Sequence, residues 1–168
     1  MLMLGMMACR GKHHRDIVKN EEPAEVTPRV ASTLKMSDAA APTQLIRGFY
    51  GLEGGTWRWT AGKFAVLLHS PTGAAQRGGT LTFSFSIPDV VIQKLKQVTL
   101  TAAIGSTTLK SQTWSKPGAF SYTADVPPEL LTKDPVTIDF ALDKSLPPGS
   151  VDQRELGIIA ISAGIEAK

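Results

Sequence analysis

From Thr43 onward, hydrophobic and polar residues alternate along the chain with a period of two. Such alternation is typical of β-strands with one buried face, because successive side chains of a strand point to opposite sides of the sheet. It is clearest between Thr80 and Ile87, where Leu and Phe alternate with Thr and Ser. The pattern and the glycine turns between its segments predict eight strands, at residues 45–50, 56–60, 63–68, 80–87, 98–104, 120–126, 136–142 and 156–165.

The last predicted strand, Leu156–Ile165, is apolar on both faces. This is typical of a central strand that is covered on each side. Two short helical turns are also predicted, at Asp89–Lys96 and Pro128–Leu131. Many short strands separated by turn signals favour an all-β fold, and we expect residues 44–168 to form an antiparallel, jelly-roll-like β-sandwich.

Residues 10–43 have a different composition. They are polar and charged, they include Pro23, Pro28 and Pro42, and they contain few large apolar side chains. Such a segment buries too little apolar surface to offset the conformational entropy lost on folding. The sequence therefore predicts a disordered N-terminal tail over residues 10–43, which would act as a tether for the sandwich.

The first nine residues are apolar and end in Ala8-Cys9. This order resembles the lipobox of bacterial lipoproteins, in which the cysteine is diacylated and becomes the new N-terminus. The run is shorter than a complete secretory signal, so we expect translation to begin upstream of Met1. The resemblance implies lipidation at Cys9 and a membrane-anchored lipoprotein of the cell envelope, and the alternative is a cytoplasmic protein with a free thiol. No run of 18 apolar residues predicts a transmembrane helix.

The net charge of +3 and the pI near 9.1 are those of a mildly basic protein. However, six of the 18 basic residues and four of the 15 acidic ones lie within residues 1–35. The predicted sandwich is therefore nearly neutral, and its charges are interspersed. A nucleic-acid-binding face needs clustered Lys and Arg side chains to neutralise phosphates. We expect no nucleic acid partner.

The single cysteine excludes a disulfide framework and a cysteine-rich zinc site. Only three histidines are present, and two of them are the adjacent His13 and His14, which by themselves are a poor metal signal. No cofactor and no metal ligand is predicted. The sequence leaves open a structural calcium, although no acidic cluster calls for one.

Two tryptophans, Trp57 and Trp59, occupy alternate positions of one predicted strand and therefore share a face. We predict that Trp59 fills the core. For Trp57 two interpretations stay open, a core position or an exposed stacking platform for a sugar ring. Trp114 precedes the turn at residues 116–118, and we expect it to be exposed.

Charged residues mark the entry to the last predicted strand, at residues 151–159. In one interpretation Arg154 pairs with Asp152 or Glu53 and fixes a loop over the edge of the sandwich. In the other, these groups contact hydroxyl groups of a glycan. The first interpretation is the commoner use of such an arginine.

Three motifs carry a family resemblance: residues 49–53 (FYGLE), residues 57–59 (WRW) and residues 152–157 (DQRELG). Together they resemble a β-sandwich domain that occurs beside bacterial glycosyltransferases and in other cell-envelope polysaccharide proteins. The resemblance covers residues 44–166. The likeness of that domain to carbohydrate-binding modules implies a non-catalytic role in binding or positioning glycans. The residues expected to contact the polysaccharide are Tyr50, Trp57, Trp114 and Arg154.

Catalytic patterns are weak. No Gly-x-Ser-x-Gly elbow is present, and His69 is the one histidine outside the predicted tail. A glycosidase needs two carboxylates across a cleft, for which Glu53 with Asp152 or Glu155 are the candidates. We expect a protein that is not an enzyme. An assembly module that binds an envelope protein, and a carbohydrate-active hydrolase, are the alternatives.

Overall fold

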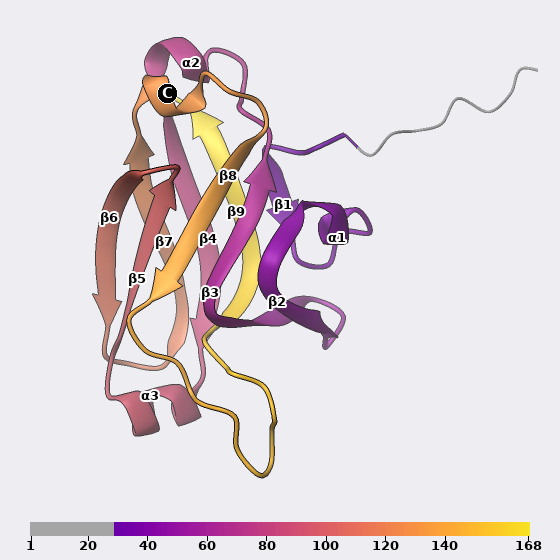
Figure 1. Cartoon of the computed structure of the whole chain (residues 1–168), viewed down its shortest axis with the longest axis vertical. Helices are drawn as coiled ribbons and strands as arrows, with labels where there is room; N and C mark the ends of the chain where they lie inside the picture. Colours follow the sequence, from indigo (N-terminus) through magenta and orange to yellow (C-terminus); the bar gives the residue numbers. More distant parts are fainter. Residues whose placement is uncertain (1–28) are drawn as a thin grey trace, which may run out of the picture.

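The computed structural model describes residues 29–168, which form an antiparallel sheet curled into a nearly closed, barrel-like sandwich (Figure 1). The all-β prediction is confirmed. The strands are β1 (Thr33–Lys35), β2 (Leu45–Glu53), β3 (Trp57–Leu68), β4 (Gly79–Ile87), β5 (Val98–Ile104), β6 (Thr107–Trp114), β7 (Gly118–Val126), β8 (Val136–Leu142) and β9 (Ile159–Ala167). The helices are α1 (Ala41–Gln44), α2 (Ala74–Arg77), α3 (Asp89–Leu95) and the 3-10 helix η1 (Pro128–Leu131).

The main path through the sheet runs β6-β5-β8-β3-β9-β4-β7, with β1 on β9 and β2 on β3. Strand β3 is twelve residues long and pairs with β9 near its start and with β8 over its second half. It therefore joins the two halves of the curled sheet. Two segments that the sequence separates, 56–60 and 63–68, belong to this one strand, because the backbone stays extended through Ala61 and Gly62.

Two strands are absent from the sequence prediction. Strand β6 lies at an end of the sheet path, and most of its side chains are exposed or half-buried on both faces, so it has no alternating pattern. Strand β1 falls inside the predicted tether. Its Leu34 and the adjacent Met36 are almost fully buried, and Leu34 pairs with Ala163 of β9. The predicted boundary at residue 43 is therefore wrong, since the sandwich already includes β1.

The segment before β2 is fixed by a buried amide. The Gln44 side chain accepts a hydrogen bond from the Ala31 N–H and donates to the carbonyls of Ala31 and Leu67. These bonds attach the start of the described chain to β3. Residues 10–28 of the predicted tether, and residues 1–9 with Cys9, lie outside the described residues.

The core lies between the layers and is built from the alternating positions that the sequence predicts. On β4, Leu81, Phe83, Phe85 and Ile87 are buried, while the Thr and Ser residues between them are half-buried. Phe64, Phe83 and Phe140 pack against one another with 4.8 to 5.4 Å between ring centroids, and Phe49 packs edge-on against Phe64 at 5.3 Å. Within residues 29–168, no helix has the length and apolar character needed to cross a bilayer.

The two end strands of the sheet path, β6 and β7, lie beside each other without forming a ladder (Figure 1). The buried Tyr122 of β7 bridges them, since its hydroxyl donates to the Lys110 carbonyl of β6. Burial raises the pKa of Tyr122, so the hydroxyl keeps its proton at neutral pH. This hydrogen bond helps to close the sandwich.

Candidate functional site

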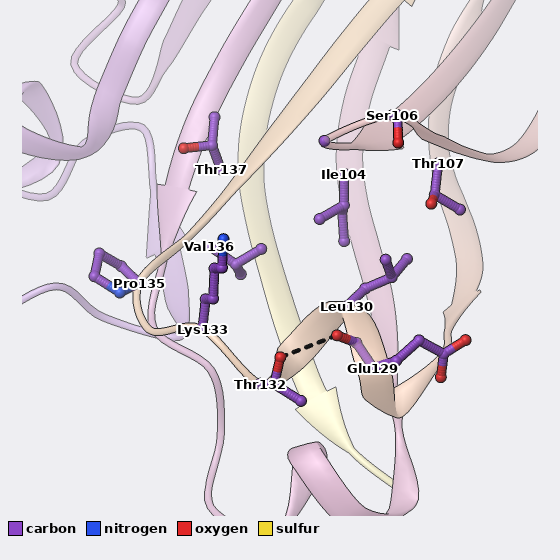
Figure 2. A pocket seen from close by; sticks show the side chains of 11 residues that line it. Ile104, Ser106, Thr107, Glu129, Leu130, Thr132, Lys133, Pro135, Val136 and Thr137 are labelled. Atoms are coloured by element: carbon purple, nitrogen blue, oxygen red, sulfur yellow. Dashed lines mark hydrogen bonds between the residues drawn. The ribbon is translucent and has the colours of Figure 1, made fainter.

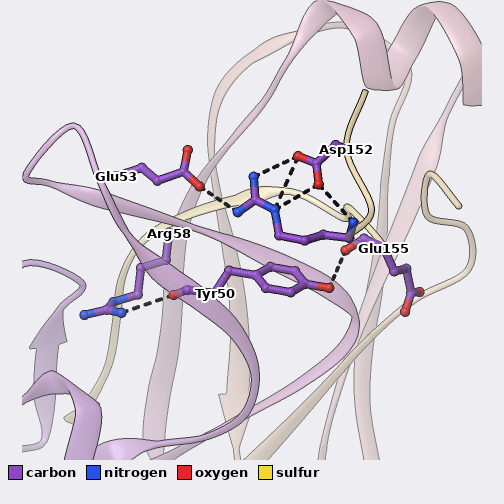
Figure 3. A network of polar contacts seen from close by, with 6 residues as sticks. Tyr50, Glu53, Arg58, Asp152 and Glu155 are labelled. Carbon is purple, nitrogen blue, oxygen red and sulfur yellow. Dashed lines mark hydrogen bonds and ion pairs between the residues drawn. The ribbon is translucent and has the colours of Figure 1, made fainter. Parts of the chain in front are cut away.

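A polar network joins the β2–β3 hairpin to the loop that precedes β9 (Figure 3). Arg154 lies at its centre. Its Nη1 donates to Glu53 Oε1 at 2.7 Å, and its Nη2 donates to Asp152 Oδ2 at 2.8 Å. Its Nε donates to Asp152 Oδ1 at 3.0 Å, so the guanidinium binds Asp152 through two nitrogens. The loop is thereby attached to the end of β2.

Tyr50 lies beneath this ion-pair group. The Arg154 Cζ atom is 5.1 Å from the centroid of the Tyr50 ring, within the range of a cation–π contact. The Tyr50 hydroxyl donates to the Glu155 carbonyl at 2.8 Å, and Arg58 Nη1 donates to the Tyr50 carbonyl at 3.1 Å. One face of Tyr50 is thus covered by arginine, and its polar end is occupied.

The neighbouring Glu155 fixes the base of the same loop. Its Oε1 accepts hydrogen bonds from the Gly62 N–H at 3.1 Å and from Ser145 Oγ at 2.5 Å. The backbones of Leu146 and Leu156 bond to each other in both directions, at 2.8 and 2.9 Å. The loop is therefore held at its base by Glu155 and further along by Arg154.

The charges of the network reinforce one another. The hydrogen bonds from Arg154 hold the pKa of Asp152 below its usual value, and the two carboxylates raise the pKa of Arg154. Both groups are therefore charged at neutral and mildly acidic pH. A carboxyl group that acts as a general acid needs a raised pKa. Asp152 is thus suited to holding the loop and to accepting hydrogen bonds.

The structure brings three of the four predicted ligand residues to this end of the sandwich. Tyr50 contacts Arg154, and Trp57 pairs across the hairpin with Glu53. Trp57 is half-buried and lies outside the core cluster, whereas Trp59 packs against the core as predicted. The interpretation in which Arg154 pairs with Asp152 or Glu53 is confirmed, because it pairs with both.

Trp114 does not join them. It lies on β6, is half-buried, and packs edge-on against Phe85 with 5.0 Å between ring centroids. Phe120 covers it from β7 at 5.9 Å. The prediction that Trp114 is exposed is therefore wrong. The sequence suggests exposure from the nearby turn, but the chain folds this strand end back onto the core.

His69 also has a partner that its sequence context does not indicate. Its Nδ1 lies 2.6 Å from Asp134 Oδ2, and Asp134 Oδ1 accepts from the Ser70 N–H at 2.9 Å. The Ser70 hydroxyl donates to the Leu131 carbonyl, so it does not complete a triad with His69. Among residues 29–168, no group of three or more His, Cys, Asp or Glu side chains could hold a metal ion.

Comparison of the sequence with models of known protein families and with curated proteins finds no match. The function must therefore be argued from the fold and from the polar network.

Loss of Arg154 should loosen the loop between β8 and β9. Replacing Arg154 by glutamine removes the bonds to Glu53 and Asp152, so a broad-specificity protease should cleave residues 143–158 several-fold faster than in the unchanged protein. The matched control is Arg47→Gln, which removes an exposed ion pair between β2 and Asp139 that does not reach the loop. Equal cleavage rates in both variants would show that Arg154 does not hold the loop. Mass spectrometry of the fragments measures the rates.

Proposed function

We propose that this protein is a non-catalytic binding module whose ligand is a cell-envelope glycan, bound at the end of the sandwich that carries Trp57 and the Arg154 network. The observation that carries the proposal is the position of Trp57, a half-buried indole outside the core and directly across the hairpin from Glu53. Sugar rings pack against aromatic faces, and their hydroxyls bond to carboxylate oxygens.

The network supports this role because its acceptors are already positioned. Arg154 bonds to Glu53 through Oε1, and no intramolecular hydrogen bond to Glu53 Oε2 is formed within residues 29–168. An ionised carboxylate accepts several hydrogen bonds, so this oxygen has capacity for a ligand hydroxyl. A pre-organised site loses less conformational entropy on binding than a mobile one.

A hydrolytic role receives less support from the same groups. Glu53 and Asp152 both bind one guanidinium, and the pKa of Asp152 is lowered. A glycosidase requires one carboxyl group that stays protonated near neutral pH. These carboxylates are better suited to binding than to proton transfer.

The proposal predicts that Trp57→Ala weakens glycan binding by at least about tenfold, which corresponds to about 1.4 kcal/mol. The measurement is a titration of bacterial polysaccharides and their oligosaccharides against the protein by calorimetry. Trp114→Phe serves as the matched control, since this aromatic side chain packs on the core and should leave binding unchanged. If none of the glycans binds, or if both variants bind equally well, the proposed site is wrong.

We further propose that the module is held at the membrane through a lipid on Cys9. Two acyl chains anchor a protein stably, whereas one gives only reversible binding. The DNA upstream of Met1 tests this. An in-frame start codon followed by basic and apolar codons would support the anchor, and a stop codon immediately upstream would exclude it.

A further inference from the structure

The turn of the β2–β3 hairpin connects the two residues on which the proposed site depends. It consists of Gly54, Gly55 and Thr56, between Glu53 of β2 and Trp57 of β3. The Thr56 N–H donates to the Glu53 carbonyl at 3.2 Å, which closes the turn. Both glycines have a left-handed backbone, with φ +56° at Gly54 and φ +69° at Gly55. This conformation favours glycine at both positions, so the backbone alone does not distinguish them.

The two glycines differ in what surrounds them. A Cβ at Gly54 would lie 2.7 Å from Nε1 of Trp57 and 3.4 Å from Cε2 of the same ring. A Cβ at Gly55 would meet no atom within 4 Å. Because heavy atoms that are not bonded to each other pack at about 3.5–4.0 Å, the ring can take this position only if residue 54 has no side chain. Gly54 therefore provides the space that the Trp57 indole occupies.

The ring of Trp57 lies against the turn with its polar edge at the surface. Within residues 29–168, its indole N–H donates no hydrogen bond, and Gln112 Oε1 is the one buried side-chain nitrogen or oxygen without a partner. Trp57 Nε1 is therefore in contact with solvent. It can only donate, whereas Glu53 Oε2, on the other side of the turn, can accept. A sugar hydroxyl does both, so each of these groups can bond to a glycan.

We propose that Gly54 is a positioning residue of the glycan site, because its missing side chain lets the Trp57 indole lie against the turn with its N–H directed to the ligand. This inference rests on the proposed function, since it concerns the same site. An alanine at residue 54 would force the ring to rotate about its side-chain torsions to a new position. An alanine at residue 55 would leave the ring where it is.

The variants Gly54→Ala and Gly55→Ala form a matched pair. Both place alanine in a left-handed backbone, so they should lower the temperature of thermal unfolding by similar amounts. Nitrogen-15 NMR of the full chain observes the indole N–H signals of the three tryptophans, and Trp57→Phe identifies the Trp57 signal by its loss. This signal should shift in Gly54→Ala and stay in place in Gly55→Ala. Equal shifts in both variants, or no shift in Gly54→Ala, would overturn the proposal.

Calorimetric titration with bacterial oligosaccharides measures the effect on the site. Gly54→Ala should weaken glycan binding by about tenfold, and Gly55→Ala by less than about twofold. A glycine with a merely structural role would change the affinity equally in both variants, and that outcome would contradict the assignment. If the Trp57 signal shifts but the unchanged protein binds no glycan, the proposed function is wrong, and the contact between Gly54 and Trp57 remains as packing only.

A hollow elsewhere on the molecule provides a control for binding at another place. It lies between the end of β5, η1 and the start of β8, and Glu129 is among the residues that line it (Figure 2). Glu129→Gln should leave both the Trp57 signal and the glycan affinity unchanged. A loss of affinity in Glu129→Gln but not in Gly54→Ala would show that the glycan binds in the hollow, and the role of Gly54 would be excluded.

Discussion

Replacing Phe64 by alanine should lower the free energy of unfolding by about 3–5 kcal/mol, the range for a large ring removed from a packed core. Phe64 is fully buried and stacks on Phe140 with 5.1 Å between ring centroids. Phe83 and the edge-on Phe49 also contact it, at 5.4 and 5.3 Å. Because these rings come from β2, β3, β4 and β8, the cavity would affect both halves of the curled sheet. Urea unfolding followed by circular dichroism measures the change.

The conservative variant Phe64→Leu provides the control. It retains most of the buried volume, so it should cost less than about 1.5 kcal/mol. If alanine costs no more than leucine, the ring packing around Phe64 does not carry the stability assigned to it.

Replacing Gly48 by alanine should lower the free energy of unfolding by about 2–5 kcal/mol, for two separate reasons. The backbone of Gly48 has φ +74°, in the left-handed region that side chains disfavour. A Cβ at this position would also collide with the Lys63 carbonyl and would lie 2.7 Å from the Phe64 Cα. Both obstacles are backbone atoms, so the strands would have to separate at the bulge where β2 crosses β3.

Gly51→Ala is the matched control on the same strand. A Cβ at Gly51 would meet no atom within 4 Å, and its φ is not in the left-handed region. We expect this variant to be close to the unchanged protein in thermal unfolding. A similar loss of stability in both variants would mean that β2 tolerates no side chain at either glycine, and that the close approach at Gly48 is not the cause.

The Arg154 network both holds the loop before β9 and lies in the proposed binding site. The side chains that the sequence suggests as glycan ligands, Tyr50 and Arg154, largely bind each other and the loop. Among residues 29–168, Trp57 and Glu53 Oε2, which accepts no intramolecular hydrogen bond, are the groups left for the proposed glycan. A mutation of Tyr50 or Arg154 is therefore expected to act on binding through the position of the loop, whereas Trp57 acts by contact.

The strands with one buried face could be predicted because each alternates clearly. Strands β4, β5, β7 and β8 have apolar residues at every second position, and the structure buries all of these residues except Phe120 of β7, which is half-buried. The pattern fails where a strand is short or open on both faces. Strand β1 contributes one fully buried side chain over three residues, and β6 has exposed side chains on both faces. Neither strand therefore has an alternation of hydrophobic and polar residues that can be recognised in the sequence.

The contacts of the candidate site were likewise predictable only where the residues lie close together in the sequence. The pairing of Arg154 with Asp152 lies within three residues and is visible in the sequence, and Glu53 could be named as an alternative partner. That Arg154 binds both carboxylates, and that it covers the Tyr50 ring, depends on the β2–β3 hairpin lying beside the loop. The burial of Trp114 against Phe85 and Phe120 likewise depends on how β6 folds over the core.

By itself, the sequence determined the all-β class, most of the strands and the buried face of each, because these follow from the local period of side chains along an extended backbone. Only the tertiary structure decided which strands are neighbours and which aromatic residues pack on the core. These features arise from contacts between residues far apart in the chain, and no local pattern encodes them.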